Sequence, residues 1–325
     1  MATEAASRTS ELPTKKQDAA VLGQSYRELE GIPLLIKRVL TLLVVFVPAV
    51  AVLLAIGLWF FNWADLSIFV GMYLVTALGI TIGFHRYGTH EGFETSTIMK
   101  AILLIAGSMA VQGPVLTWIS DHRCHHAFSD KPGDPHSPHA DQHGVAAGLL
   151  HAHVGWLFSA RQSRKSRFVP KLKADPVVSA IDHLFPLFFV ATFAIPFGLG
   201  LLLKGDLHGA VMTLLFAGLV RVFAVNHVTW SINSVCHMFG KQPYDVQDES
   251  RNVFWLAWLS LGEAWHHNHH ASQTSACHGF VWWQKLGDPS WWVIWSLEQI
   301  GLVWNVKRPK LERLKPRAQT VVNPA

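Results

Sequence analysis

Charged residues are scarce in this chain of 325 residues, where Asp, Glu, Lys and Arg together make up 15%. Soluble proteins carry roughly 25%, so this composition argues against an ordinary soluble enzyme. Half of the residues are hydrophobic, which excludes a disordered chain. Three cysteines, none in Cys-x-x-Cys spacing, exclude a disulfide scaffold. The net charge of +5 is too small to indicate nucleic acid as a partner.

The chain also lacks the usual means of collecting electrons. No Gly-x-Gly-x-x-Gly follows a strand to hold a nicotinamide or flavin cofactor. Three scattered cysteines cannot ligate an iron–sulfur cluster, which commonly needs four. The chain is rich instead in histidine, with 19 residues, and in tryptophan, with 14. Histidine at that density in an apolar chain indicates metal binding.

Four long segments are almost entirely uncharged and rich in hydrophobic residues, at 39–61, 66–84, 184–203 and 207–232. Each is about long enough to cross a hydrocarbon core of about 30 Å, and short turns at 62–65 and 204–206 join them in two hairpins. A buried soluble hairpin is the less favoured alternative, because the first hairpin has almost no polar face. We expect an all-α integral membrane protein with four transmembrane helices. Its parts are a polar, mostly disordered tail (1–31), the membrane domain with a histidine-rich cytosolic cap (32–304) and a basic tail (305–325).

Three further apolar stretches, at 101–120, 253–261 and 291–304, are expected to lie on one leaflet. A crossing at 101–120 would place the histidine clusters on opposite faces of the membrane. Lys and Arg concentrate before the first span, between the second and third, and after the fourth, so both termini and the active site are expected to be cytoplasmic, in a bacterial inner membrane. Arg221 lies within the last span, where we expect a neutralising partner rather than a functional role.

Three histidine clusters adjoin these hydrophobic segments. They comprise His85 and His90; His122, His125 and His126; and His266, His269 and His270. In the shared H-x-x-H-H spacing, the second histidine lies about −60° and the third about +40° around the helix axis from the first. The rings therefore diverge, and one triplet can bind two adjacent metals. Eight imidazoles exceed the four ligands of a typical zinc site and favour two iron ions. Zinc could bind as an inactive substitute.

Two further ligands are predicted at the end of the fourth span. His237 would be a ninth ligand, and Asn233, one turn earlier, could hold a metal-bound water. Gly88 is expected to end a helix and so turn His85 and His90 inward. Other histidines are expected to be exposed (His136, His139, His143, His208 and His278) or to pack near the site (His151, His153, His183, His227 and His267).

The motifs HRYGTH, DHRCHH, NSVCH and EAWHHNHH, in this order between hydrophobic hairpins, resemble those of the membrane fatty-acid desaturases. The likeness is greatest to the stearoyl-CoA (acyl-CoA Δ9) branch, covers about residues 35–290 and includes the H-V-G-W run at 153–156. It implies four spans beneath a cytosolic cap and a di-iron centre. One iron would take His85, His90, His122, His126 and His270. The other would take His125, His237, His266 and His269, with Asn233 reaching it through water.

The resemblance also implies the substrate and the reaction. An acyl tunnel would run past Gln112 and Trp230, with Asp121 near the head group. The enzyme would use O2 to place a cis double bond, at Δ9, in a long-chain fatty acyl thioester such as acyl-CoA; another acyl carrier stays open. A di-iron membrane hydroxylase is the alternative enzyme. A metal-binding membrane transporter is the alternative of another class, and it predicts ionisable residues in the span centres, which the first two spans lack.

Desaturation needs two external electrons, so a separate carrier with its reductase is expected to dock on the cytoplasmic face. Candidates are a ferredoxin, a rubredoxin or a cytochrome b5. The C-terminal tail offers six basic residues against Glu312: Lys307, Arg308, Lys310, Arg313, Lys315 and Arg317. Such a surface could attract an acidic carrier, or it could bind anionic membrane lipid.

Overall fold

The computed structural model describes residues 21–57, 62–139 and 144–317. Four long apolar stretches of helix run through it, which confirms the predicted four membrane-spanning helices. The first is α2 (Gly31–Gly57), and the second is α3 (Trp63–Leu78) continued by the π-helix η1 (Gly79–Thr89). The third is α10 (Phe185–Lys204). The fourth combines α11 (Leu207–Thr213), π-helix η3 (Leu214–Val220), α12 (Arg221–Ser234) and 3-10 turn η4 (Val235–His237).

The helix boundaries differ from the hydropathy pattern at functionally important ends. The second and fourth helices continue to Thr89 and His237, five residues beyond the predicted ends at 84 and 232. Hydropathy marks only the part of a helix that lies in lipid, whereas backbone hydrogen bonding continues into the cap. The predicted end of the first span, at 58–61, lies outside the described residues.

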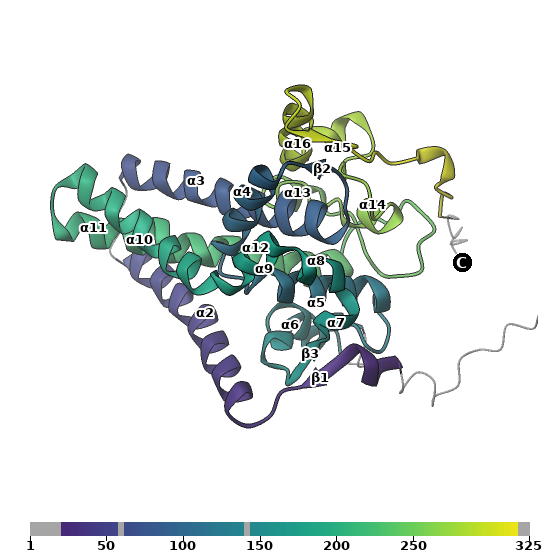
Figure 1. Cartoon of the computed structure of the whole chain (residues 1–325), viewed down its shortest axis with the longest axis horizontal. Helices are drawn as coiled ribbons and strands as arrows, with labels where there is room; N and C mark the ends of the chain where they lie inside the picture. Colours follow the sequence, from purple (N-terminus) through teal and green to yellow (C-terminus); the bar gives the residue numbers. More distant parts are fainter. Residues whose placement is uncertain (1–20, 58–61, 140–143, 318–325) are drawn as a thin grey trace, which may run out of the picture.

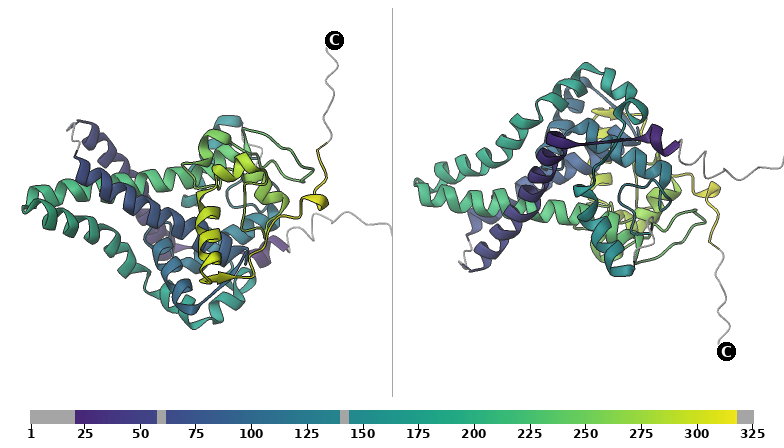
Figure 2. Two further views of the ribbon diagram at one scale, coloured as in Figure 1. Left: turned by 90° about the horizontal axis from the view of Figure 1, so that it is seen from above. Right: turned by 90° about the horizontal axis from the view of Figure 1, so that it is seen from below.

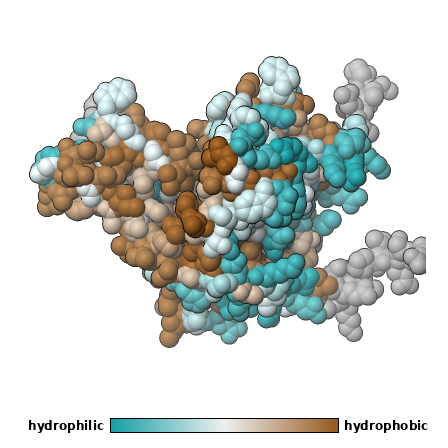
Figure 3. Space-filling view, turned by 45° about the horizontal axis from the view of Figure 1, so that its top comes forward, coloured by the Kyte–Doolittle hydropathy of each residue, from teal (hydrophilic) through white to brown (hydrophobic). Residues whose placement is uncertain are grey.

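The four helices project from one side of the cap (Figures 1 and 2). In their most apolar windows, 44% and 50% of residues are buried in the second and fourth helices, but only 11% and 17% in the first and third. The second and fourth helices therefore form the inner pair, and the other two present most of their side chains outward. Hydrophobic residues cover the projecting helices, and hydrophilic residues gather on the cap (Figure 3).

The cap consists of short helices and two small antiparallel strand pairs. β1 (Tyr26–Glu28) pairs with β3 (Arg161–Ser163), and β2 (Glu94–Thr95) pairs with β4 (Val303–Trp304). The helices before the third span are α4 (Thr97–Ser108), α5 (Val115–Phe128), α6 (Val145–His153), η2 (Gly155–Phe158), α7 (Lys165–Phe168), α8 (Pro170–Ala174) and α9 (Pro176–His183). Those after the fourth are α13 (Phe254–Ala257), α14 (His266–Ala271), α15 (Trp282–Leu286), α16 (Pro289–Gln299) and η5 (Leu311–Arg313).

The apolar stretch 101–120 is not a single helix. α4 ends at Ser108 and α5 begins at Val115, and the turn between them contains Val111 with φ of 64° and Gly113 with φ of 101°. Neither helix reaches the roughly 20 residues that a crossing requires, and the same holds for α13 and α16. The expectation that these stretches do not cross is confirmed. The largest hydrophobic cluster, which includes Phe84, Leu104 and Ile119, packs η1, α4 and α5 together beneath the histidines.

The N-terminal tail is more ordered than expected. Residues 26–28 pair with β3, and the Tyr26 hydroxyl donates to the Gly133 carbonyl at 2.5 Å. The prediction of a disordered tail up to residue 31 is therefore wrong for its last part, and residues 1–20 lie outside the described chain. The basic C-terminal segment also joins the cap, because the Arg317 amide donates to the Pro243 carbonyl at 3.1 Å.

The partners of Arg221 are neutral oxygen atoms rather than the neutralising group that the sequence predicts. Its side chain is fully buried and donates to the Thr192 hydroxyl at 2.7 Å and to the carbonyls of Thr192 at 3.3 Å and Met109 at 3.4 Å. In the described part of the chain, carbonyl and hydroxyl dipoles thus take the place of a carboxylate. Because Met109 follows α4 directly, Arg221 clamps the turn that carries Gln112.

Asp65 is buried in the first turn of α3, which begins at Trp63, so it does not lie in the turn that the sequence predicts at 62–65. Its carboxylate accepts from Lys204 Nζ at 2.6 and 2.7 Å and from the Thr213 hydroxyl at 2.5 Å. The ion pair ties the first hairpin to the second. The predicted 204–206 turn is confirmed, with Gly205 in the left-handed region and Asp206 capping α11.

Replacing Asp65 with Ala should lower the free energy of unfolding by about 3 kcal/mol, because the Lys204 ammonium loses its counter-ion in a mostly buried place. The measurement is the unfolding transition in detergent. The double variant Asp65→Leu/Lys204→Met, which removes both charges, should recover much of the loss. A double variant that loses the full sum of the single effects would contradict the pairing.

Candidate metal centre

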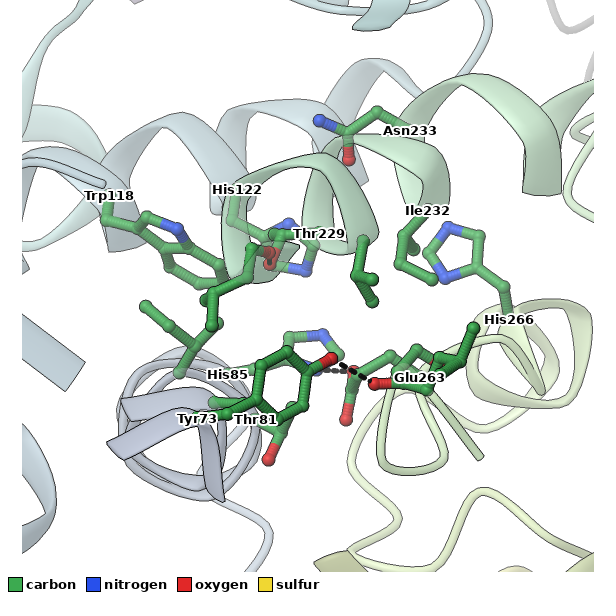
Figure 4. Close-up of a pocket in the computed structure, with 16 residues that line it drawn as sticks. Tyr73, Thr81, His85, Trp118, His122, Thr229, Ile232, Asn233, Glu263 and His266 are labelled. Carbon is green, nitrogen blue, oxygen red and sulfur yellow. Dashed lines mark hydrogen bonds and ion pairs between the residues drawn. The ribbon is translucent and has the colours of Figure 1, made fainter. Parts of the chain in front are cut away.

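All nine predicted histidine ligands converge in the cap. They form two adjoining groups, and within each group the potential ligand atoms lie within 4.8 Å of one another. The first group contains His85, His90, His122, His126 and His269, and the second contains His125, His237, His266 and His270. Five separate elements supply them: η1, the residue after η1, α5, η4 and α14. Figure 4 shows His85, His122 and His266 reaching one pocket from three of these elements.

The partition of the third cluster is the reverse of the one that the family resemblance suggested. His269 Nε2 lies 3.0 Å from His126 Nε2 and 3.2 Å from His85 Nε2, which places His269 in the first group. His270 Nε2 lies 3.1 Å from His266 Nε2 in the second group. Helical angles predict that the two rings diverge, but only the position of α14 decides which ring faces which group.

A π-helix brings His85 and His90 together, not a helix end at Gly88. The His90 amide donates to the His85 carbonyl at 3.2 Å, the i to i−5 bond of a π-turn. Residues five apart then share a face, and the two ring centroids lie 4.7 Å apart. Gly88 has another role, because a Cβ there would lie 2.6 Å from Ile119 Cδ1. It allows η1 to approach α5 closely.

The donor set fits metal ions. Burial, together with neighbouring histidines, holds the pKa of His122, His126, His266 and His269 well below its usual value, so these imidazoles are neutral. Neutral imidazole is the form that binds metal. Adjacent Nε2 atoms are 3.0 to 3.2 Å apart, close to the distance between neighbouring ligands when metal–nitrogen bonds are about 2.1 Å. Facing lone pairs at that distance repel each other unless a cation lies between them.

Four carboxylates that the sequence analysis did not identify orient the rings. His125 Nδ1 donates to Asp134, His237 Nδ1 to Asp130 and His270 Nδ1 to Asp248, each at 2.8 Å. His85 Nδ1 likewise contacts Glu263. Each pair fixes the tautomer that leaves Nε2 free for a metal. Burial alone would raise the pKa of Asp134, but the adjacent His125 outweighs it and lowers that pKa to about 2.

Glu263 is itself held by a fully buried arginine. Arg86 Nη2 donates to Glu263 Oε1 at 3.0 Å and to Asp288 Oδ1 at 2.8 Å. Two histidines predicted to be exposed are also buried here: His278 lies beside Glu263, and His136 stacks on His125 with centroids 4.5 Å apart. The sequence could have indicated Glu263, which opens the EAWHHNHH motif.

A largely apolar pocket ends at the histidines. Its walls come from α3, η1, α5 and α12, with side chains such as Ala77, Ile80 and Val228, and its polar end is formed by His85, His122, His266 and Glu263. Asn233 lines the same pocket (Figure 4). Tyr73 lines the far part of the pocket, where its hydroxyl donates to the Leu259 carbonyl at 2.6 Å. The pocket is suited to an apolar chain that passes next to the metal-binding groups.

Residues 62–284 match the family model described as Fatty acid desaturase. The chain is 39% identical over 279 residues to a hex-5-enoyl-[acyl-carrier protein] acetylenase of Moorena producens, covering 83% of this chain and 86% of that protein. It is 37% identical over 250 residues to an sn-1 stearoyl-lipid 9-desaturase of Anabaena variabilis, covering 76% of this chain and 85% of that protein. It is 34% identical over 253 residues to an sn-1 stearoyl-lipid 9-desaturase of Synechocystis, covering 77% of this chain and 74% of that protein.

The chain belongs to the fatty acid desaturase family. It is therefore an oxidoreductase of lipid metabolism. The family match includes the second to fourth spans and all nine histidines, which are the elements that build the pocket and its polar end.

The predicted substrate residues of this desaturase lie around the pocket rather than in its wall. Gln112 donates to the Thr229 hydroxyl at 2.9 Å and accepts from Trp118 Nε1 at 3.0 Å, and both partners line the pocket. Trp230 is buried against the rings of His153 and His227, one layer away.

The third predicted substrate residue, Asp121, is farther out. It accepts from the Ser163 hydroxyl of β3 at 2.6 Å. Of the histidines expected to be exposed, His139 and His208 are exposed and His143 lies outside the described residues. His153 Nε2 and His227 Nδ1 form a hydrogen-bonded pair at 2.9 Å.

Replacing Asp248 with Asn should weaken metal retention about 10- to 100-fold, because the amide no longer fixes the tautomer of His270. Metal content after timed exposure to a chelator measures this. Asp245→Asn, at an exposed position on the same loop, is the matched control and should retain metal like the unmodified protein. Equal retention in both variants would contradict a role for the carboxylate.

The metal-free protein should lose stability as the pH falls below about 6.5. Unfolded histidines titrate near 6.5, whereas burial and neighbouring histidines hold the pKa of His122, His126, His266 and His269 well below that value. The unfolded state then binds more protons, at up to about 1.4 kcal/mol per pH unit for each residue. Unfolding midpoints between pH 8 and 5 test this. His269→Gln should flatten the dependence, and His208→Gln, at an exposed site, should not.

Proposed function

We propose that this desaturase uses two iron ions and O2 to introduce a cis double bond at Δ9 of a long-chain acyl group. The observation that carries the proposal is the pair of adjoining histidine groups at the end of an apolar pocket. Nine imidazole nitrogen donors are too many for one ion and suit iron. The same donors could take up zinc, which would give an inactive protein because zinc has no redox chemistry.

The reaction balance defines what the protein must do. A –CH2–CH2– unit loses two hydrogens, O2 takes up four electrons, and two water molecules form; two electrons come from the acyl chain and two from outside. Bound iron would supply the oxidising power that side chains lack. The apolar pocket excludes water and holds one pair of carbons beside the histidines, so that position along the chain is selected by geometry. The histidine–carboxylate pairs keep the ligand rings in one orientation.

The proposed substrate is an acyl chain carried by a membrane lipid. Two of the relatives above are named as stearoyl-lipid 9-desaturases and one as acting on an acyl-carrier-protein substrate, so an acyl thioester is the other carrier to test. Gln112 would shape the acyl path through Trp118 and Thr229, with Trp230 behind it. Asp121 would lie on the head-group side, and Asn233 would reach the second metal through water.

We place the cap and both termini on the cytoplasmic side of a bacterial inner membrane. The positive-inside rule supports this, because basic residues are concentrated in the cap and the tails. The described N-terminal and C-terminal segments both join the cap, at β1 and at the segment after β4 (Figure 1). An external electron carrier, such as a ferredoxin, a rubredoxin or a cytochrome b5 with its reductase, would then have access to the cap.

Expression in a host that makes only saturated acyl chains tests the proposal. The expected product is a cis-Δ9 monounsaturated chain in the membrane lipids, located by mass spectrometry, and two irons per chain in the purified active protein. His269→Ala should abolish the product while the protein still accumulates in the membrane.

Other outcomes are equally informative. A hydroxylated chain would identify a hydroxylase, and unsaturated thioesters that precede unsaturated lipids would identify a thioester substrate. One metal per fully active chain would refute the two-iron centre.

A further inference from the structure

A second opening reaches the histidine centre from the surface of the cap. Its lining includes His90, Arg123, His126, Gln273 and Thr274. None of the residues that line it also lines the apolar pocket, which instead reaches His85, His122 and His266. The centre is therefore approached from two separate sides. One approach is apolar, and the other is bordered by polar and charged side chains.

At this second opening two rings of the centre lie near the surface of the cap. His90 is 9% exposed and His126 is half-buried, and both belong to the first histidine group. By contrast, the four histidines of the second group are at most 5% exposed. Ala127, Gln273 and Thr274 form an exposed rim around these two rings.

The surroundings of the opening are mainly basic, and in the described part of the chain the one acidic neighbour that contacts a lining residue is exposed Glu91, whose Oε1 lies 3.4 Å from Arg123 Nη2. Arg123 lines it and is held by the carbonyls of Gly88, Thr89 and Phe168 at 3.0 to 3.1 Å. The C-terminal segment runs alongside, because the Lys307 amide donates to the Gly92 carbonyl and the Lys307 carbonyl accepts from the Ala276 amide, both at 2.8 Å. Gly92 lies two residues after the lining residue His90, and Ala276 lies two residues after the lining residue Thr274.

The described tail continues this positive border. The exposed side chains of Lys307, Arg308 and Lys310 follow one another, and Arg308 pairs with Glu298 at 2.5 Å. Figure 1 shows this segment passing beyond α14, which carries the third histidine cluster. Part of the basic tail that the sequence predicts at 305–325 thus lies beside the second opening.

We propose that the opening lined by His90 and His126 is the docking surface for a small acidic one-electron carrier protein. This rests on the proposed redox function of the centre. Two reduced carriers would each give up one electron per turnover and leave oxidised, while the two protons come from water. Electron transfer weakens steeply with distance, so a carrier must dock close to the metal-binding rings, as it can at this opening. The apolar pocket is taken by the acyl chain, and the positive border complements an acidic partner.

Direct binding tests the proposal, with a plant-type [2Fe–2S] ferredoxin and the soluble domain of cytochrome b5 as acidic probes. In detergent at low salt, the double variant Lys307→Glu/Lys310→Glu should weaken binding at least 10-fold and flatten its salt dependence. Gln273→Glu, which adds a negative charge to the rim, should weaken binding several-fold. The control Arg161→Glu lies on β3, at a different side of the cap (Figure 1), and should bind within twofold of the unmodified protein.

Turnover separates docking from chemistry. In the double variant the KM for the carrier should rise, with kcat unchanged. Product yield in one turnover after reduction by dithionite should equal that of the unmodified protein. No product from the dithionite-reduced unmodified protein would mean that the proposed function has failed, whatever the binding result.

Three results would overturn the docking proposal itself. The first is an unmodified protein that binds neither probe, and the second is an affinity that Gln273→Glu does not change. The third is a double variant, Lys307→Glu/Lys310→Glu, that binds the carrier normally but binds anionic phosphatidylglycerol vesicles more weakly. This third result would mean that the basic segment binds membrane lipid.

Discussion

The structure of the centre depends on four buried imidazole–carboxylate pairs. Asp130, Asp134, Asp248 and Glu263 each take up the Nδ1 side of a ligand ring, so that the Nε2 atoms face one another across two small spaces. Buried carboxylates are costly unless they are paired. The ligand rings and Arg86 supply partners for these carboxylates, and the Nε2 atoms that face one another could hold metal ions.

Of the four described membrane helices, only the inner pair contributes histidines to this centre. The inner pair extends beyond the apolar region, and each member brings a ligand to the cap, His85 at the end of one and His237 at the end of the other. The pocket lies between these two helices, so an acyl chain that enters it has one path along the ligands. The Asp65 ion pair ties the second span to Lys204 of the third, and Arg221 ties the fourth span to Thr192 of the third, so each inner helix is fixed to α10 where a charge in an apolar setting must find partners.

Two separate approaches to one centre reconcile opposite demands of the chemistry. An unactivated carbon chain needs a dry, apolar wall, whereas reduction needs a polar surface that a protein partner can touch. The π-helical turn contributes to both, because it directs His85 toward the apolar pocket and His90 toward the polar opening. The first histidine group therefore faces both approaches, whereas the second reaches only the apolar pocket, through His266.

The sequence by itself determined the four spans and the nine histidines that converge in the cap, because hydropathy and the spacing of the histidine motifs are local properties that survive any arrangement of the helices. It did not reveal Asp130, Asp134 or Asp248, since single acids in loops have no period to identify them. Only the tertiary structure decided that His269 joins the first group and His270 the second. A helical angle gives the direction of one ring relative to another, but the position of the helix axis, which packing sets, decides what each ring meets.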